Sequence, residues 1–246
     1  MSGFIKLLFT AFSQSITSFL YLLIIMAAYL QIKRRAQLEE TWLGFLRDTI
    51  INRLMYVMLY GMIAGLITSS LIIVTGIYVD ISTIIVIWPL ALLLTFLNER
   101  YLCFSYAGGI IALISLLFDW PNIDVSGVIS IIGILHFTES ILILLDGHRD
   151  ALPVIMEHKR FKPIGAFVLA RLWPVPLIVL ITPNSGIPIL NGMLSMPNWW
   201  LTLGLHGEGE LMLFPLAILL EYSGLAITAR PKERTRTTGL LLGAYS

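Results

Sequence analysis

Apolar segments separated by short polar connectors recur along nearly the whole chain of 246 residues. Seven segments are close to the ~20 residues needed to cross a hydrocarbon core: 16–32, 54–78, 81–97, 101–118, 125–145, 163–182 and 211–229. We therefore expect an all-α fold, a polytopic transmembrane helical bundle of about seven spans in a single domain, 1–246. The last apolar run, 237–246, is too short to span. It either lies at the surface or begins a truncated eighth span, and we favour the second interpretation.

Composition agrees with the membrane class, because 57% of the residues are hydrophobic and 13% are charged. The net charge of +1 indicates no particular partner, since the placement of charge matters more than its sum in a membrane protein. The basic residues form no patch interleaved with aromatic side chains, so we expect no nucleic acid partner. The only cysteine, Cys103, excludes an intrachain disulfide and a cysteine-rich metal site.

Lysine and arginine are confined to alternate connectors. All of them except Lys6 and Arg171 lie in 33–53, 98–100, 146–162 and 230–236. Because cytoplasmic loops carry the excess of Lys and Arg, these connectors are predicted to be cytoplasmic. The chain is then a multi-pass protein of the cell (plasma) membrane with its N-terminus outside.

The cytoplasmic connectors are the predicted contacts for partner proteins and for the lipid bilayer. Basic side chains near the surface favour anionic lipid by about 1 kcal/mol each. Connector 33–53 has apolar residues at helical spacing, so it is either an amphipathic surface helix or a solvated loop. The candidate contacts are Lys33, Arg34, Arg35, Arg149, Lys159, Arg160, Arg230, Lys232, Arg234 and Arg236.

A second set of polar residues lies within or at the ends of the apolar segments. His136, Glu139 and Asp146 follow at spacings of 3 and 7, which puts them on one helical face. At a helical rise of about 1.5 Å per residue, Glu139 lies roughly 9 Å below the cytoplasmic end of its segment, and Arg171 and Glu221 roughly 12 Å. Because unpaired charges at that depth are costly, we predict that these groups pair in a buried polar cluster. Its members are His136, Glu139, Arg171 and Glu221.

This buried cluster has two interpretations. In the first it is a structural clamp that fixes how three helices pack, since buried polar groups commonly specify packing. In the second it is a proton or ion relay. His136 and Glu139 lack further ligands at metal-binding spacing, and the sequence has no zinc-protease helix, phosphate loop or nucleophile elbow. We therefore expect no metal, no cofactor and no enzymatic activity.

Glycine and proline positions add two local expectations. Gly61 and Gly65 form a small-xxx-small pair, which allows another helix to approach closely. Pro174 and Pro176 lack backbone donors, so the helix expected over 163–182 should bend or break there.

Three short motifs resemble a family of Gram-positive membrane proteins. They are GHR at 147–149 with a Pro-Val pair at 153–154, RLWPVP at 171–176, and PKERTR at 231–236 ahead of an apolar run. In these motifs the chain is similar to the membrane region of MinJ-type cell-division topology proteins. The resemblance implies several transmembrane helices followed by a C-terminal PDZ domain. It also implies a scaffold that links DivIVA-like and MinD-like division proteins at the septum and poles.

The residues in hand contain no PDZ sequence, so this soluble domain is expected beyond residue 246. The predicted function is a non-enzymatic integral membrane scaffold or anchor that positions cell-division regulators. The alternative is a small transporter or channel that uses the intramembrane cluster of His136, Glu139, Arg171 and Glu221.

Overall fold

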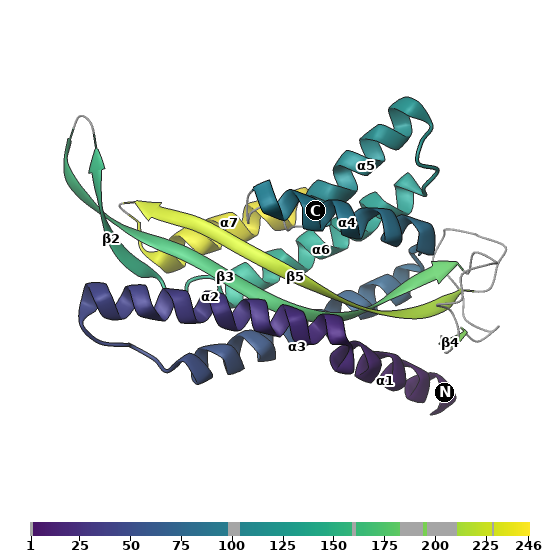
Figure 1. Cartoon of the computed structure of the whole chain (residues 1–246), viewed down its shortest axis with the longest axis horizontal. Coiled ribbons are helices and arrows are strands. Elements are labelled where there is room, and N and C mark those ends of the chain that lie inside the picture. The colour runs from purple at the N-terminus through teal and green to yellow at the C-terminus, as the bar shows by residue number, and fades with distance from the viewer. Residues whose placement is uncertain (1, 98–103, 159–160, 183–193, 196–210, 228) are drawn as a thin grey trace.

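Seven helices and five strands make up the part of the chain that the computed structural model describes, residues 2–97, 104–158, 161–182, 194–195, 211–227 and 229–246. Figure 1 shows the two longest strands, β3 and β5, crossing the middle of the molecule as a twisted ribbon with helices along it. The elements are α1 (Ser2–Thr17), α2 (Phe19–Leu43), α3 (Ile50–Thr75), β1 (Tyr78–Asp80), α4 (Ile81–Leu97), α5 (Phe104–Phe118), α6 (Val125–Asp146), β2 (Leu152–His158), β3 (Phe161–Thr182), β4 (Leu194–Ser195), β5 (Met212–Ile227) and α7 (Pro231–Tyr245).

Strand β3 is the centre of the sheet. Residues 166–181 of β3 pair antiparallel with β5, and the short β4 pairs with the start of β5. On its other edge, β3 pairs antiparallel with β2 through 161–168 and parallel with β1 through 180–182. Between these two partners, residues 169–179 face no strand on that edge within the described part of the chain.

The prediction of an all-α bundle of about seven spans is wrong, because two segments expected to be helices form the strands β3 and β5. Pro174 and Pro176 explain the first case, since each would cost a helix about 3 kcal/mol. In a strand, residues two apart point their backbone groups toward the same edge. The N–H of Ile178 points to α3 and not to β5, so the proline nitrogens lie on that same edge. No bond of the β3–β5 ladder is lost there.

The number of membrane-spanning candidates is also smaller than predicted. Within the described residues, only α3 and α6 are long and apolar enough to cross a membrane on their own. Helices α1 and α2 together give a third candidate, although the chain bends by 52° between them. Connector 33–53, for which a surface helix and a solvated loop were both open, is instead partly the end of α2, and the basic residues after 230 begin α7.

Helix α3 covers the open edge of β3. Gly61 and Gly65 lie against the carbonyl oxygens of Pro174 and Pro176, respectively. A Cβ atom at either glycine would overlap the carbonyl oxygen that faces it. The small-xxx-small pair therefore packs against the edge of a strand, whereas the sequence predicted that it would pack against another helix.

The contact continues one turn further along α3, where Ser69 Oγ accepts a hydrogen bond of 2.9 Å from the backbone N–H of Ile178. The repeat is possible because four residues of helix rise about 6.0 Å and two residues of strand rise about 6.7 Å. Each step of four along α3 therefore meets the next backbone group on the same edge of β3.

Side chains from two other helices bind the backbone of the sheet. Arg35 of α2 donates hydrogen bonds to the carbonyl oxygens of Val168 and Ala170 in β3. Ser15 of α1 donates to the carbonyl oxygen of Leu216 in β5. Strand backbone that is shielded from water needs hydrogen-bond partners for its polar groups, and these side chains supply partners at three carbonyl oxygens.

Replacing Gly65 tests the packing of α3 on β3. In Gly65→Ala the added methyl group meets the Pro176 carbonyl, so we expect the free energy of unfolding to fall by about 1–3 kcal/mol. The matched control is Gly109→Ala in α5, where nothing lies within 4 Å of the added Cβ. There alanine should be neutral or stabilising. Thermal unfolding in detergent measures both, and equal melting temperatures would contradict the observed packing.

Candidate functional site

Asp146, the last residue of α6, is a fully buried acceptor for two side chains of β3. Its Oδ2 accepts a hydrogen bond of 2.8 Å from Arg171 Nε and one of 2.9 Å from the indole N–H of Trp173. Arg171 and Trp173 are two residues apart in the strand, so both project from the same face of the sheet. The end of α6 is thereby fixed to β3.

Arg171 and Arg53 meet a second carboxylate, that of Asp150. Arg171 Nη1 donates to Asp150 Oδ2 at 2.6 Å, and Arg53 Nε lies 3.6 Å from Asp150 Oδ1. Asp150 lies in the turn after α6 with a left-handed backbone, φ 54°. This conformation is uncommon for a residue other than glycine, and aspartate tolerates it better than most.

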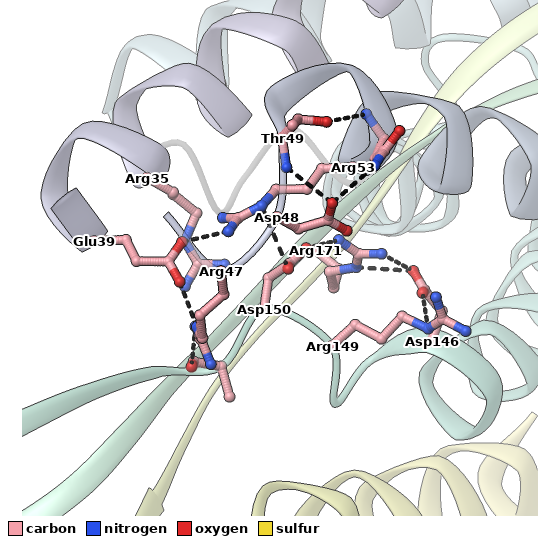
Figure 2. Close-up of polar contacts among 12 residues, drawn as sticks. Arg35, Glu39, Arg47, Asp48, Thr49, Arg53, Asp146, Arg149, Asp150 and Arg171 are labelled. Carbon is pink, nitrogen blue, oxygen red and sulfur yellow. Dashed lines mark hydrogen bonds and ion pairs between the residues drawn. The ribbon is translucent and has the colours of Figure 1, made fainter. Parts of the chain in front are cut away.

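Glu39 extends this set of contacts to α2. It accepts hydrogen bonds from both Arg53 and Arg47, while at the other end Arg149 Nε lies 3.3 Å from Asp146 Oδ1. Figure 2 shows the resulting row of side chains, in which basic and acidic groups alternate. We refer to it as the ion-pair chain. In order, its members are Arg47, Glu39, Arg53, Asp150, Arg171, Asp146 and Arg149.

Helix ends bring the ion-pair chain together. Thr49 caps α3, with its side chain accepting from the backbone N–H of Asn52, so Arg53 lies in the first turn. Because α3 begins and α6 ends at the same end of the molecule, Arg53 and Asp146 join the same ion-pair chain although they are distant in sequence. Arg47 also donates to the Ala151 carbonyl at 2.8 Å, which ties the connector between α2 and α3 to the start of β2.

The inner members of the ion-pair chain are shielded from water. Four of the five inner side chains are at most 4% exposed, whereas the terminal Arg47 and Arg149 are 41% and 40% exposed. Each buried ion costs several kcal/mol of desolvation, which is offset only if it meets a well-placed opposite charge. Because basic and acidic residues alternate along the ion-pair chain, every inner side chain has an opposite charge on both sides. Three helices and β3 are tied together at this point.

A small cavity adjoins the ion-pair chain between Arg35, Arg53 and Arg171. Its volume of about 20 Å³ is room for about one water molecule. In this conformation the cavity beside the ion-pair chain is therefore too small to hold a solute larger than water.

The structure does not bring the four residues of the predicted polar cluster together as one group. His136 Nδ1 and Glu139 Oε2 form their own pair at 3.1 Å on α6. Arg171 meets Asp146 and Asp150 instead. Glu221 is opposite Leu172 in the β3–β5 register, so its side chain projects from the opposite face of the sheet to that of Arg171.

The predicted cytoplasmic contacts divide into three groups. Arg35 is engaged with the backbone of β3, and Arg149 belongs to the ion-pair chain. Lys159 and Arg160 lie outside the described residues. The others are exposed, on α2 or at the start of α7: Lys33, Arg34, Arg230, Lys232, Arg234 and Arg236.

Sequence reasoning left six members of the ion-pair chain out of the predicted cluster: Glu39, Arg47, Arg53, Asp146, Arg149 and Asp150. Each lies in a connector that was assigned to solvent or to the membrane surface. One sequence signal could have identified these residues: the ends of apolar segments that leave the membrane on the same side lie close together. Charged residues of both signs within a turn or two of those ends are therefore candidates for buried pairs.

Comparison with known proteins adds no assignment, since no family model, curated protein or solved structure matches the chain. The resemblance to MinJ-type proteins therefore stays a prediction. Within the described residues, no three His, Cys, Asp or Glu side chains converge as a metal-binding group.

Neutralising Asp146 tests the ion-pair chain. In Asp146→Asn, Arg171 loses one of its two carboxylates in a buried site, and we expect a loss of about 3–5 kcal/mol in the free energy of unfolding. Adding Arg171→Met should recover part of that loss, since the stranded charge is then gone. Glu139→Gln is the control, expected to cost under ~1 kcal/mol because its partner His136 is 29% exposed. Additive losses in the double variant would contradict a direct pair.

His148 predicts a pH dependence. It lies in the turn after α6, where burial first and the charge of Lys232 second hold its pKa below the ordinary value of 6.5. Below pH 6.5 the unfolded chain therefore binds more protons than the folded chain, so stability is full above this pH and falls as the pH decreases. His148→Gln should flatten this part of the profile, measured by chemical unfolding across pH in detergent. An unchanged slope in the variant would assign the dependence to another group.

Proposed function

We propose that this chain is a non-enzymatic, multi-pass membrane anchor that presents a basic face to anionic partners. One observation carries the proposal: the two long apolar helices α3 and α6 reach the same end of the molecule, and the ion-pair chain joins them there. Membrane-spanning helices are apolar along their length and carry charged residues where they leave the hydrocarbon core. Helices α3 and α6 have this arrangement at the end where the ion-pair chain joins them.

The outer surface supports insertion in a bilayer. Large apolar side chains are exposed along α3 and α5, among them Leu59, Leu66, Leu113, Leu116 and Leu117. In water so many exposed apolar side chains would be a liability, whereas in a bilayer they would face lipid.

The distribution of charge supports an orientation in which the ion-pair chain faces the cytoplasm. Exposed Lys33 and Arg34 lie in the second half of α2, and exposed Lys232 and Arg234 lie at the start of α7. Cytoplasmic segments carry this excess of basic residues. The start of α1 lies at the other end of α3, since Ile5 lines a groove with residues 73 and 74. This position supports the proposal that the N-terminus is outside.

A scaffold role fits this arrangement better than transport does. The buried charges neutralise one another, and the cavity beside them holds about one water. The exposed residues Lys33, Lys232 and Arg234 add a basic surface for partners. From the resemblance to MinJ-type proteins, division proteins similar to DivIVA and MinD are the proposed partners, positioned at the septum and poles.

Cysteine labelling tests insertion and orientation together. In a Cys103→Ser background, Asn122→Cys lies between α5 and α6, and Thr41→Cys lies near the end of α2; both sites are exposed. A membrane-impermeant thiol reagent should label Asn122→Cys in intact cells, and Thr41→Cys only after permeabilisation. Recovery of the protein in the soluble fraction would contradict the anchor, and the reverse labelling pattern would contradict the orientation.

A further inference from the structure

Arg149, the outer end of the ion-pair chain, is held from two directions. Its Nε lies 3.3 Å from the Asp146 carboxylate. Its guanidinium carbon lies 4.5 Å from the ring centroid of Tyr56 and 5.7 Å from that of Tyr60, within the range of cation–π attraction. The side chain is still 40% exposed, and among the residues that the structure describes its ionic contact is through Nε alone, with none at its two terminal nitrogens. A planar donor group is thus held in place with two nitrogens left open.

An exposed apolar stripe runs along α3 from this position. Tyr56, Leu59, Ile63 and Leu66 follow at spacings of 3, 4 and 3, which is one face of a helix, and they are 41%, 55%, 41% and 52% exposed. The 26 residues of α3 extend about 39 Å, longer than a hydrocarbon core of about 30 Å. About one turn therefore projects at each end, and Tyr56 in the second turn lies near the hydrocarbon boundary.

We propose that Arg149, Tyr56 and the α3 stripe form a binding site for one anionic phospholipid. The two open nitrogens of Arg149 donate to the phosphate in the paired geometry that arginine favours. The tyrosines lie at the level of the ester groups, and an acyl chain lies along Leu59, Ile63 and Leu66. This inference rests on the proposed membrane anchor and identifies its lipid contact.

Charge complementarity favours an anionic lipid over a zwitterionic one. The ion-pair chain holds four arginines and three carboxylates, and its excess charge is carried by the exposed ends. A headgroup with net negative charge is attracted there, whereas the ammonium group of phosphatidylcholine gains nothing from it.

The test is a titration of the purified full chain in detergent with short-chain phosphatidylglycerol, followed by thermal unfolding. The wild type should show a saturable rise in melting temperature, as expected for a ligand that binds the folded state. Arg149→Gln should raise the half-saturating concentration about fivefold, and Tyr56→Leu should raise it by less. The control Lys6→Gln removes one exposed positive charge on α1 and should leave it unchanged.

Two further titrations identify the source of the effect. Phosphatidylcholine of the same chain length and inorganic phosphate should each give little shift. An equal response to phosphatidylcholine, or a full response to phosphate alone, would overturn the proposal, as would equal half-saturation in the wild type and Arg149→Gln.

Arg149→Lys keeps the charge and loses the paired geometry. This variant should bind with intermediate strength, so the proposal stays testable if Arg149→Gln folds poorly. Membrane fractionation of the same variants separates this inference from the anchor itself. A protein that stays in the membrane but gives no lipid response rejects only the lipid site.

Discussion

The open edge of β3 is the constraint on which the rest of the structure depends. Strand backbone presents polar groups along each edge, and an apolar surrounding offers no water to bind them. Prolines at 174 and 176 remove two donors from that edge, and α3 covers the remaining carbonyls with Gly61 and Gly65. Because one helix step of four matches one strand step of two, a single straight helix can follow the edge over three contacts.

The ion-pair chain fixes the same assembly at one end. Asp146 holds Arg171 of β3, Asp150 holds Arg53 of α3, and Glu39 of α2 closes the row. The glycine contacts of α3 repeat at steps of four along the edge of β3, so on their own they would also permit a shift by one step. Each buried charge of the ion-pair chain needs an opposite charge beside it, and only one register of α3 against β3 provides this. The two features therefore act together: the glycines set the distance between α3 and β3, and the ion-pair chain sets their relative position.

The helices of the first five apolar segments could be predicted from the sequence, because each is long enough and bounded by polar connectors. The strands could not, since a buried apolar run has the same composition in either state. The spacing of Pro174 and Pro176 was the usable signal for β3. The helical interpretation also misplaced Arg171, because it put the end of a membrane span at Pro163, whereas residues 161–168 pair with β2 in a hairpin. Depths computed for a helix therefore matched Arg171 with Glu139, whereas the strand brings it to Asp146 and Asp150.

Backbone chemical shifts of residues 166–181 test the central claim most directly. The protein, labelled with ¹³C at valine and isoleucine and reconstituted in bilayers, would be measured by magic-angle-spinning NMR. Val175, Ile178, Val179 and Ile181 should show strand shifts, with Cα values below and Cβ values above those of unstructured chains. Helical shifts at these positions would contradict the strand, and with it the packing of α3 on its edge and the partners of Arg171.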